Sequence, residues 1–378
     1  MVAANPLLTI VDYGQSVWMD NLSRDLIVSG QLQALLQSRG IRGITSNPAI
    51  FQKAIAGNAI YDDAILAGIK AGRPVMDIYE SLAFEDIQNA CDIFRPLYDE
   101  TDGLDGYVSI EVAPELARDT AGTIAAAQRY WETLGRPNVM IKIPGTPEGL
   151  VAVEQVIAAG INVNVTLLFS VQAYVETAWA YIRGLEARAA AGQPIDRIAS
   201  VASFFLSRID TKVDKLLETL AAQASPEEQA KILSFQGKVA IANAKVAYER
   251  FRDIFAGERW QMLVNQGAKV QRLLWASTST KNPQYRDVMY VEELIGPDTV
   301  NTLPPETIEA CADHCQISDH LLGDLSTADD LLAAVSAAGV DLDQAMAELL
   351  DEGIQKFVEP FNALLASLAA KAEQLATV

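Results

Sequence analysis

The sequence predicts a (β/α)8 TIM barrel, because short strand-like runs alternate with helical patterns over most of its 378 residues. The run at residues 139–143 is apolar except for one lysine, as expected for a strand that is buried on both faces of a parallel sheet. Seven of the eight runs also have a polar residue at or near their carboxyl end. Because the active sites of such barrels lie at the carboxyl ends of the strands, these polar residues are expected to meet.

The first three strands are expected at Ser16–Met19, Gly43–Thr45 and Tyr107–Ile110, where apolar residues dominate. A helical pattern follows the first strand. Residues 50–100 carry helical periodicity with several breaks, which predicts extra helices between the second and third strands. After the third strand, a helix is expected to open at a proline and to cover residues 114–134.

The fourth strand is the apolar run of residues 139–143, and the only charge within it is Lys142. Pro144 and Gly145 end the strand, and Thr146-Pro147 is a typical N-cap and first position of a helix. Burying an ammonium group costs free energy and favours the neutral amine, which is a nucleophile that forms Schiff bases with carbonyls. The structural alternative is a lysine that guards a sheet edge or extends to water.

The remaining four strands are expected at 161–168, 197–205, 271–277 and 299–303. Two long helices are expected within 207–256 and a third at 257–269, so the second large helical addition lies after the sixth strand. Further helices continue from residue 306 to 378. Because no low-complexity linker divides the chain, one domain is expected over 1–378, with its barrel core at about 16–305 and a C-terminal helical region at about 306–378.

The composition narrows the choice of partners and compartment. The chain has 29 basic and 49 acidic residues and a net charge of −20, which argues against nucleic acid or an anionic membrane as the main partner. Its three cysteines, an odd number, fit a reducing compartment, and we expect the cytoplasm. The N-terminus lacks the pattern of a signal peptide, and no apolar run approaches the ~18 residues of a membrane-spanning helix.

Six segments, in the same order and at barrel spacing, resemble those of the transaldolase family. They are GITSNPAIF (43–51), VSIEVAPELARDT (108–120), VMIKIPGTPEG (139–149), INVNVTLLFS (161–170), SFFLSRID (203–210) and WASTSTKNP (275–283). The SVWMDNLSR start, the STSTKNP segment and the chain length resemble the longer bacterial subfamily. This resemblance implies an enzyme of the class I Schiff-base aldolase superfamily that needs neither cofactor nor metal.

The resemblance also implies a role for each strand-end residue. Lys142 matches the Schiff-base lysine, and Asp20 matches the acid/base residue that takes the proton from the hydroxyl beside the cleaved bond. Glu111 matches a carboxylate that works through a water, which Thr166 helps to hold. The implied substrate-binding residues are Thr45, Asn47, Asn164, Ser203, Phe205, Arg208, Ser277 and Lys281.

Within that set, the family assigns Asn47 and Asn164 to the hydroxyls of the dihydroxyacetone unit. Ser203, Arg208 and Ser277 match the residues that hold the substrate phosphate. Shorter relatives carry an arginine two residues after the last of these serines, whereas Ser279 occupies that position here. The nearest cation, Lys281, is therefore the expected substitute.

The implied reaction transfers a three-carbon ketol unit from sedoheptulose 7-phosphate to glyceraldehyde 3-phosphate, giving erythrose 4-phosphate and fructose 6-phosphate in the pentose phosphate pathway. Two alternatives remain open. One is an aldolase like fructose 6-phosphate aldolase, whose small members have tyrosine at the position of Phe205 and lack the Glu111 carboxylate. The other is a sugar-phosphate-binding barrel without catalysis, which would not explain Lys142 together with Asp20 and Glu111.

The chain also contains Cys311, His314, Cys315 and His320, residue types that bind metals. Their spacing does not match a common zinc pattern, and the two cysteines have the i, i+4 spacing that helix packing also produces. We therefore expect no metal site.

Overall fold

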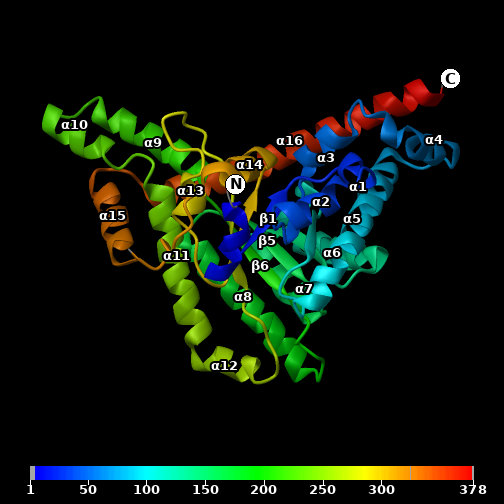
Figure 1. Ribbon diagram of the computed structural model, residues 1–378, viewed down its shortest axis with the longest axis horizontal. Coiled ribbons are helices and arrows are strands. Elements are labelled where there is room, and N and C mark those ends of the chain that lie inside the picture. Colours follow the sequence, from blue (N-terminus) through cyan, green and yellow to red (C-terminus); the bar gives the residue numbers. More distant parts are fainter. Residues whose placement is uncertain (1–4, 324, 377–378) are drawn as a thin grey trace.

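Eight parallel strands close into a barrel in which each strand pairs with its neighbours in the sequence and β8 pairs with β1. The computed structural model describes residues 5–323 and 325–376. The strands are β1 (Gln15–Asp20), β2 (Gly43–Thr45), β3 (Tyr107–Glu111), β4 (Val139–Pro144), β5 (Val163–Leu168), β6 (Ser200–Phe205), β7 (Arg272–Ala276) and β8 (Thr299–Leu303). The predicted (β/α)8 TIM barrel is thus confirmed, and the helices that surround it are seen in Figure 1.

Helices connect the strands and extend beyond the last of them. The first half of the chain contains η1 (Pro6–Tyr13), α1 (Arg24–Val28), α2 (Gln31–Ser38), α3 (Pro48–Ile55), η2 (Ala59–Tyr61), α4 (Asp62–Lys70), α5 (Val75–Glu100), η3 (Pro114–Arg118), α6 (Thr120–Leu134), α7 (Pro147–Ala158) and α8 (Val171–Ala190). The second half contains α9 (Ser207–Ala221), α10 (Pro226–Leu233), α11 (Val239–Ala256), α12 (Glu258–Val264), α13 (Met289–Glu292), α14 (Pro305–His314), α15 (Leu325–Ala337) and α16 (Leu342–Ala376). The large additions follow β2 and β6, as predicted.

In two regions, the structure divides the chain into more helices than the sequence predicted. The region 207–256 holds three helices rather than two, because Ser225 and Glu228 form a capping box that starts α10. The helix expected over 114–134 begins as the 3-10 turn η3 and restarts at Asp119, whose side chain accepts a hydrogen bond from the Gly122 amide.

Three of the expected strands begin later than the apolar runs indicated. Residues 161–162 and 197–199 precede β5 and β6, and residue 271 precedes β7. The Asn162 side chain binds the backbone at Val139 and Ala199, so it pairs with the edges of the strands instead of extending one.

A buried ion-pair network fills the amino-terminal end of the barrel. Arg272 on β7 lies 3.0 Å from Asp105 and donates a hydrogen bond of 2.8 Å to the Ser16 hydroxyl. Arg42 lies 2.6 Å from the same aspartate. Burial alone would raise the pKa of Asp105, but the two guanidinium groups outweigh it and lower that pKa. These ion pairs close the amino-terminal end of the barrel. A substrate-binding site is therefore expected at the carboxyl end.

Helix α16 lies at that opposite, carboxyl end of the strands. It packs against α3, α4, α5, α9 and β5, and Figure 1 shows it as the long red helix beside α3. Lys212 on α9 holds it through ion pairs of 2.7 Å with Glu348 and Glu352, and Arg118 contacts Asp351 from the other side. Among the described helices, none is long and apolar enough to cross a membrane.

Candidate active site

The strand register places Lys142 between two polar side chains at the same level of the barrel. Lys142 on β4 is paired with Glu111 on β3 and with Asn164 on β5. Two pairs further along the same strands, Thr166 on β5 is paired with Pro144. Asp20 on β1 is paired with Thr45 on β2. Neighbouring parallel strands thus bring together residues that are far apart in the sequence.

The amine of Lys142 is buried and points into this group. Only 5% of the residue is exposed, and the Nζ donates a hydrogen bond of 3.0 Å to the Ser46 carbonyl. The same atom lies 3.5 Å from the Glu111 Oε2, whereas the Glu111 Oε1 has no hydrogen-bond partner. The lysine therefore does not extend to water or guard an edge, and one carboxylate oxygen beside it is free to hold a water.

Asp20, the last residue of β1, lies inside the barrel mouth and accepts a hydrogen bond of 2.6 Å from the Thr45 hydroxyl. That hydroxyl is 2.7 Å from the hydroxyl of Thr302 on β8, so three strands fix its position. Burial raises the pKa of Asp20, and the positive charges of Lys142 and Arg208 oppose this rise without cancelling it.

Burial also raises the pKa of Glu111, although Lys142 opposes the shift through its charge and a hydrogen bond. A carboxyl group whose pKa is raised toward neutral pH is suited to exchange protons during a reaction. Glu111 lies 3.5 Å from the Lys142 amine, and Asp20 lines the same cavity as that amine, an arrangement typical of a functional site.

Thr166 lies beside an irregularity in β5. The pairing of β5 with β6 shifts between Val165 and Leu168, and Leu167 has a positive φ of 61°. Such a bulge re-aims the neighbouring side chains and often occurs next to an active site. The Thr166 hydroxyl is buried and has no hydrogen-bond partner, so it is available to a substrate or a water.

The two predicted amides are held in different ways. Asn164 donates a hydrogen bond of 3.2 Å to Ser109 and accepts one of 2.6 Å from the Ser203 hydroxyl, so both ends of its side chain are engaged. Asn47 caps α3 by accepting a hydrogen bond of 3.0 Å from the Ile50 amide, and it also lines the cavity.

The other end of the cavity is cationic. Arg208 in the first turn of α9 lies over the Phe205 ring, with 5.1 Å between the guanidinium carbon and the ring centroid, and its Nη1 has no hydrogen-bond partner. Ser277 follows β7, and its hydroxyl is 2.8 Å from that of Ser207. Lys281 donates a hydrogen bond of 2.6 Å to Ser279. Burial lowers the pKa of Arg208, but a guanidinium group remains protonated at neutral pH.

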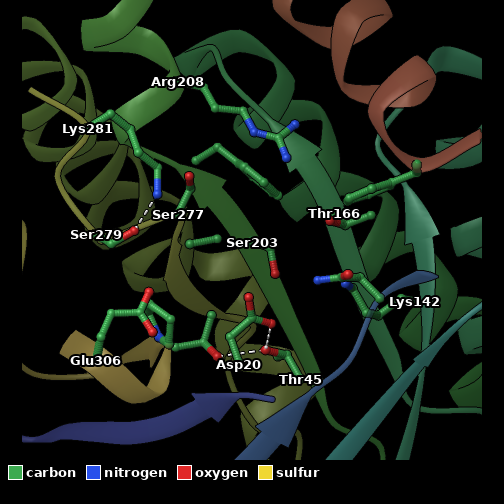
Figure 2. Close-up of a pocket in the computed structure, with 16 residues that line it drawn as sticks. Asp20, Thr45, Lys142, Thr166, Ser203, Arg208, Ser277, Ser279, Lys281 and Glu306 are labelled. Carbon is green, nitrogen blue, oxygen red and sulfur yellow. Dashed lines mark hydrogen bonds between the residues drawn. The ribbon is translucent and has the colours of Figure 1, made fainter. Parts of the chain in front are cut away.

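A cavity of about 200 Å³ connects these groups. Figure 2 shows Arg208 and Lys281 at one end, and Asp20 and Lys142 toward the other. Ten of the twelve residues expected from the sequence line it: Asp20, Thr45, Asn47, Lys142, Thr166, Ser203, Phe205, Arg208, Ser277 and Lys281. Glu111 and Asn164 do not line it and instead contact lining residues, Lys142 and Ser203.

Sequence reasoning missed several lining residues, and Phe357 on α16 is the most informative of them. Its ring centroid lies 5.7 Å from the Lys142 amine and 5.8 Å from the Arg208 guanidinium carbon. Glu306 and Thr302 also line the cavity. A phenylalanine in an amphipathic helix has the pattern of an ordinary core residue, so the sequence gives no signal that this one reaches the site.

The cysteine and histidine set does not converge. Cys311 and Cys315 are buried, whereas His314 is exposed and contacts the carboxylates of Asp287 and Asp313, and His320 is exposed as well. Within 5–323 and 325–376, no group of three or more histidine, cysteine, aspartate or glutamate residues has the arrangement of a metal site.

Comparison with known proteins places the chain in a family. The model of the transaldolase/fructose-6-phosphate aldolase family matches residues 17–368. The chain is 58% identical to a transaldolase of Trichodesmium erythraeum and 59% identical to transaldolase 2 of Nostoc punctiforme, in both cases over the whole of both chains. It is also 46% identical to a transaldolase of Thiobacillus denitrificans, with 94% of this chain and 97% of that one covered. The chain therefore belongs to the transaldolase/fructose-6-phosphate aldolase family, and its full-length similarity to bacterial transaldolases makes it a transferase of that family.

Proposed function

We propose that this chain transfers a dihydroxyacetone unit from sedoheptulose 7-phosphate to glyceraldehyde 3-phosphate, reversibly, through an imine on Lys142. The observation that carries the proposal is the buried Lys142 amine, 3.5 Å from Glu111 and in one cavity with Asp20. The reaction would belong to the non-oxidative pentose phosphate pathway and would take place in the cytoplasm.

The first half of the reaction forms the imine. The neutral amine of Lys142 attacks the ketone carbon of the donor, and the resulting carbinolamine loses water to give the imine. The role of Glu111 is to move protons between this oxygen and a water. Its unpartnered Oε1 supports that role, because it is available to accept a hydrogen bond from a water, and the unpartnered Thr166 hydroxyl is a second group available to a water.

The second half breaks and remakes a carbon–carbon bond. Asp20 accepts the proton of the hydroxyl beside the scissile bond, an aldehyde leaves, and the bonding electrons move into the imine to give an enamine. The acceptor aldehyde then adds to the enamine, Asp20 returns the proton, and water releases the ketose from Lys142. The raised pKa of Asp20 supports this role, because it makes the carboxylate a stronger base than an ordinary aspartate.

The cationic end of the cavity supports recognition of a phosphorylated substrate. Arg208, Ser277 and Lys281 supply a guanidinium, a hydroxyl and an ammonium group there, which are the groups that bind phosphate oxygens. They also offset the net charge of −20, which would otherwise repel an anionic sugar. Asn47 and Asn164 are proposed to orient the hydroxyls of the dihydroxyacetone unit near the amine.

Assays of transfer and of release test the proposal. With sedoheptulose 7-phosphate and glyceraldehyde 3-phosphate, we expect stoichiometric erythrose 4-phosphate and fructose 6-phosphate, and no turnover in Lys142→Met. With fructose 6-phosphate alone, we expect little dihydroxyacetone, because Phe205 has no hydroxyl to protonate the enamine. Release of dihydroxyacetone as fast as transfer would instead identify an aldolase. Binding without turnover would identify a non-catalytic barrel.

A further inference from the structure

Two buried aspartates on α9 lie outside the machinery described so far. Asp210 and Asp214 are one helical turn apart and are 2% and 7% exposed. Neither lines the cavity that holds Lys142. A carboxylate buried to this extent costs free energy unless it is well hydrogen-bonded, so its partners indicate what it stabilises.

Each aspartate accepts a hydrogen bond from a tyrosine of the segment 277–290, which follows β7. The Tyr290 hydroxyl donates to the Asp210 Oδ2 at 2.7 Å, and the Tyr285 hydroxyl donates to the Asp214 Oδ2 at 2.7 Å. The Asp210 Oδ1 accepts a hydrogen bond of 2.8 Å from the amide of Ala240, in the first turn of α11. The Asp214 Oδ1 accepts one of 3.1 Å from the amide of Gly237, two residues before α11. The two carboxylates thus join three parts of the chain.

The joined parts are the ones that carry the candidate phosphate ligands. Arg208 is on α9, two residues before Asp210, whereas Ser277 and Lys281 belong to the segment 277–290. A cavity of about 180 Å³ beside this junction is lined by Asp210, Asp214, Lys281 and Tyr285 among others. The tyrosines therefore connect the segment to α9 beside a cavity that Lys142 does not line.

The segment also contains a conformation that needs support. Ser277 has a φ of +56°, which is uncommon for a residue with a side chain and persists only where the surroundings enforce it. Its carbonyl accepts a hydrogen bond of 3.1 Å from the Ser207 amide at the start of α9. A fixed contact between α9 and the segment is thus a condition for the position of the Ser277 side chain.

We propose that Asp210 and Asp214, through Tyr290 and Tyr285, are positioning residues that lock the segment 277–290 against α9, so that Ser277 and Lys281 face Arg208 as one preformed phosphate site. This inference rests on the proposed function, since it assumes that these three residues bind the substrate phosphate. The aspartates themselves do not touch the substrate. Their effect is confined to the recognition of the phosphate.

The test compares a phosphorylated acceptor with an unphosphorylated one, in the full-length protein. The variants are Tyr285→Phe, Tyr290→Phe and their combination, each of which removes a hydroxyl and keeps the ring. The matched control is Tyr248→Phe, whose hydroxyl donates a hydrogen bond of 3.0 Å to the Pro297 carbonyl, away from this junction. For the double variant we expect the KM for glyceraldehyde 3-phosphate to rise by about ten- to hundredfold, with kcat nearly unchanged.

With the donor at saturating concentration and unphosphorylated glyceraldehyde as acceptor, kcat/KM for the acceptor should be the same in these variants as in the unmodified enzyme, because the donor half-reaction does not enter that ratio. Tyr248→Phe should be unchanged with both acceptors. Equal losses with both acceptors, or no loss with either, would overturn the proposal. Arg208→Gln reports separately on the proposed function. If that variant kept its preference for the phosphorylated acceptor, the phosphate site itself would be misplaced, whatever the tyrosine variants showed.

Discussion

At the scale of single residues, the site depends on a few buried charged groups. The free-energy cost of burying each of them is offset by attraction to neighbours of opposite charge. Lys142, Glu111, Asp20 and Arg208 lie in or beside one cavity, and the charges of Lys142 and Arg208 oppose the rise in pKa that burial causes in both carboxyl groups. The strand ends made most of these residues predictable, because a polar residue at the end of an apolar run is expected at the mouth of a barrel. The hydrogen bonds of Asn164 and the free hydroxyl of Thr166 depend on the register and the bulge of β5, which the sequence does not reveal.

The first residue-scale prediction concerns Glu111→Gln. The amide keeps the size of the side chain but cannot take up a proton, so imine formation and hydrolysis should slow by about 10²- to 10⁴-fold. Rapid-quench trapping of the imine with borohydride measures the rate of its formation. An unchanged rate would show that Glu111 only balances the charge of Lys142.

A second prediction concerns the acid limb of the pH profile. Asp20 must be ionised to accept a proton, and burial raises its pKa. Activity should therefore begin to fall, as pH decreases, at a higher pH than an ordinary aspartate with a pKa of about 3.9 would allow. The measurement is kcat/KM against pH for the donor. An acid limb centred at or below that ordinary value would contradict this role for Asp20.

At the scale of elements, the alternation of strands and helices made the barrel and its two large additions predictable. The division of 207–256 was wrong because the Ser225 cap lies within a nearly continuous helical pattern. The contribution of α16 was missed for a different reason. A helix that covers a site has the same amphipathic pattern as one that covers a core, so only the packing of Phe357 between Lys142 and Arg208 reveals it.

The element-scale prediction is that α16 keeps water away from the enamine through Phe357. Phe357→Leu shortens the side chain beside Lys142, so more enamine should be protonated and the ratio of released dihydroxyacetone to transferred product should rise several-fold. The matched control is Phe361→Leu, one turn away, because Phe361 packs on Tyr79 at 5.5 Å and not on the cavity. Equal ratios in the two variants would show that the ring at position 357 serves packing alone.

At the scale of the whole molecule, one end of the barrel serves stability and the other holds the candidate active site. The amino-terminal end is closed by Arg272, Asp105 and Arg42, and the carboxyl end holds the cavity under α16. The alternating strands allowed the closed barrel to be predicted. The single domain, expected because no linker divides the chain, stays a prediction, and we propose that the chain folds as one unit. Guanidinium unfolding followed by tryptophan fluorescence and by circular dichroism should give coincident transitions. Two separate transitions would indicate a C-terminal region that folds independently.

The ion pairs at the closed end should control the stability of the molecule. Asp105→Asn leaves the Arg272 charge buried without its partner, which should lower the free energy of unfolding by about 3–5 kcal/mol at pH 7. Because the folded pKa of Asp105 is lowered, its contribution is complete above the unfolded pKa and is lost as pH falls through the folded one. The difference between the two proteins should therefore shrink at acid pH, which urea titrations at pH 7 and pH 3 would reveal.

The most direct measurement of the central claim is reduction with borohydride in the presence of fructose 6-phosphate, followed by peptide mass mapping. Lys245 is the internal control, since it is the other buried lysine among the described residues and is 6% exposed. We predict an adduct on the peptide that contains Lys142 and none on the peptide that contains Lys245. An active enzyme that is trapped at another lysine, or at none, would contradict the account.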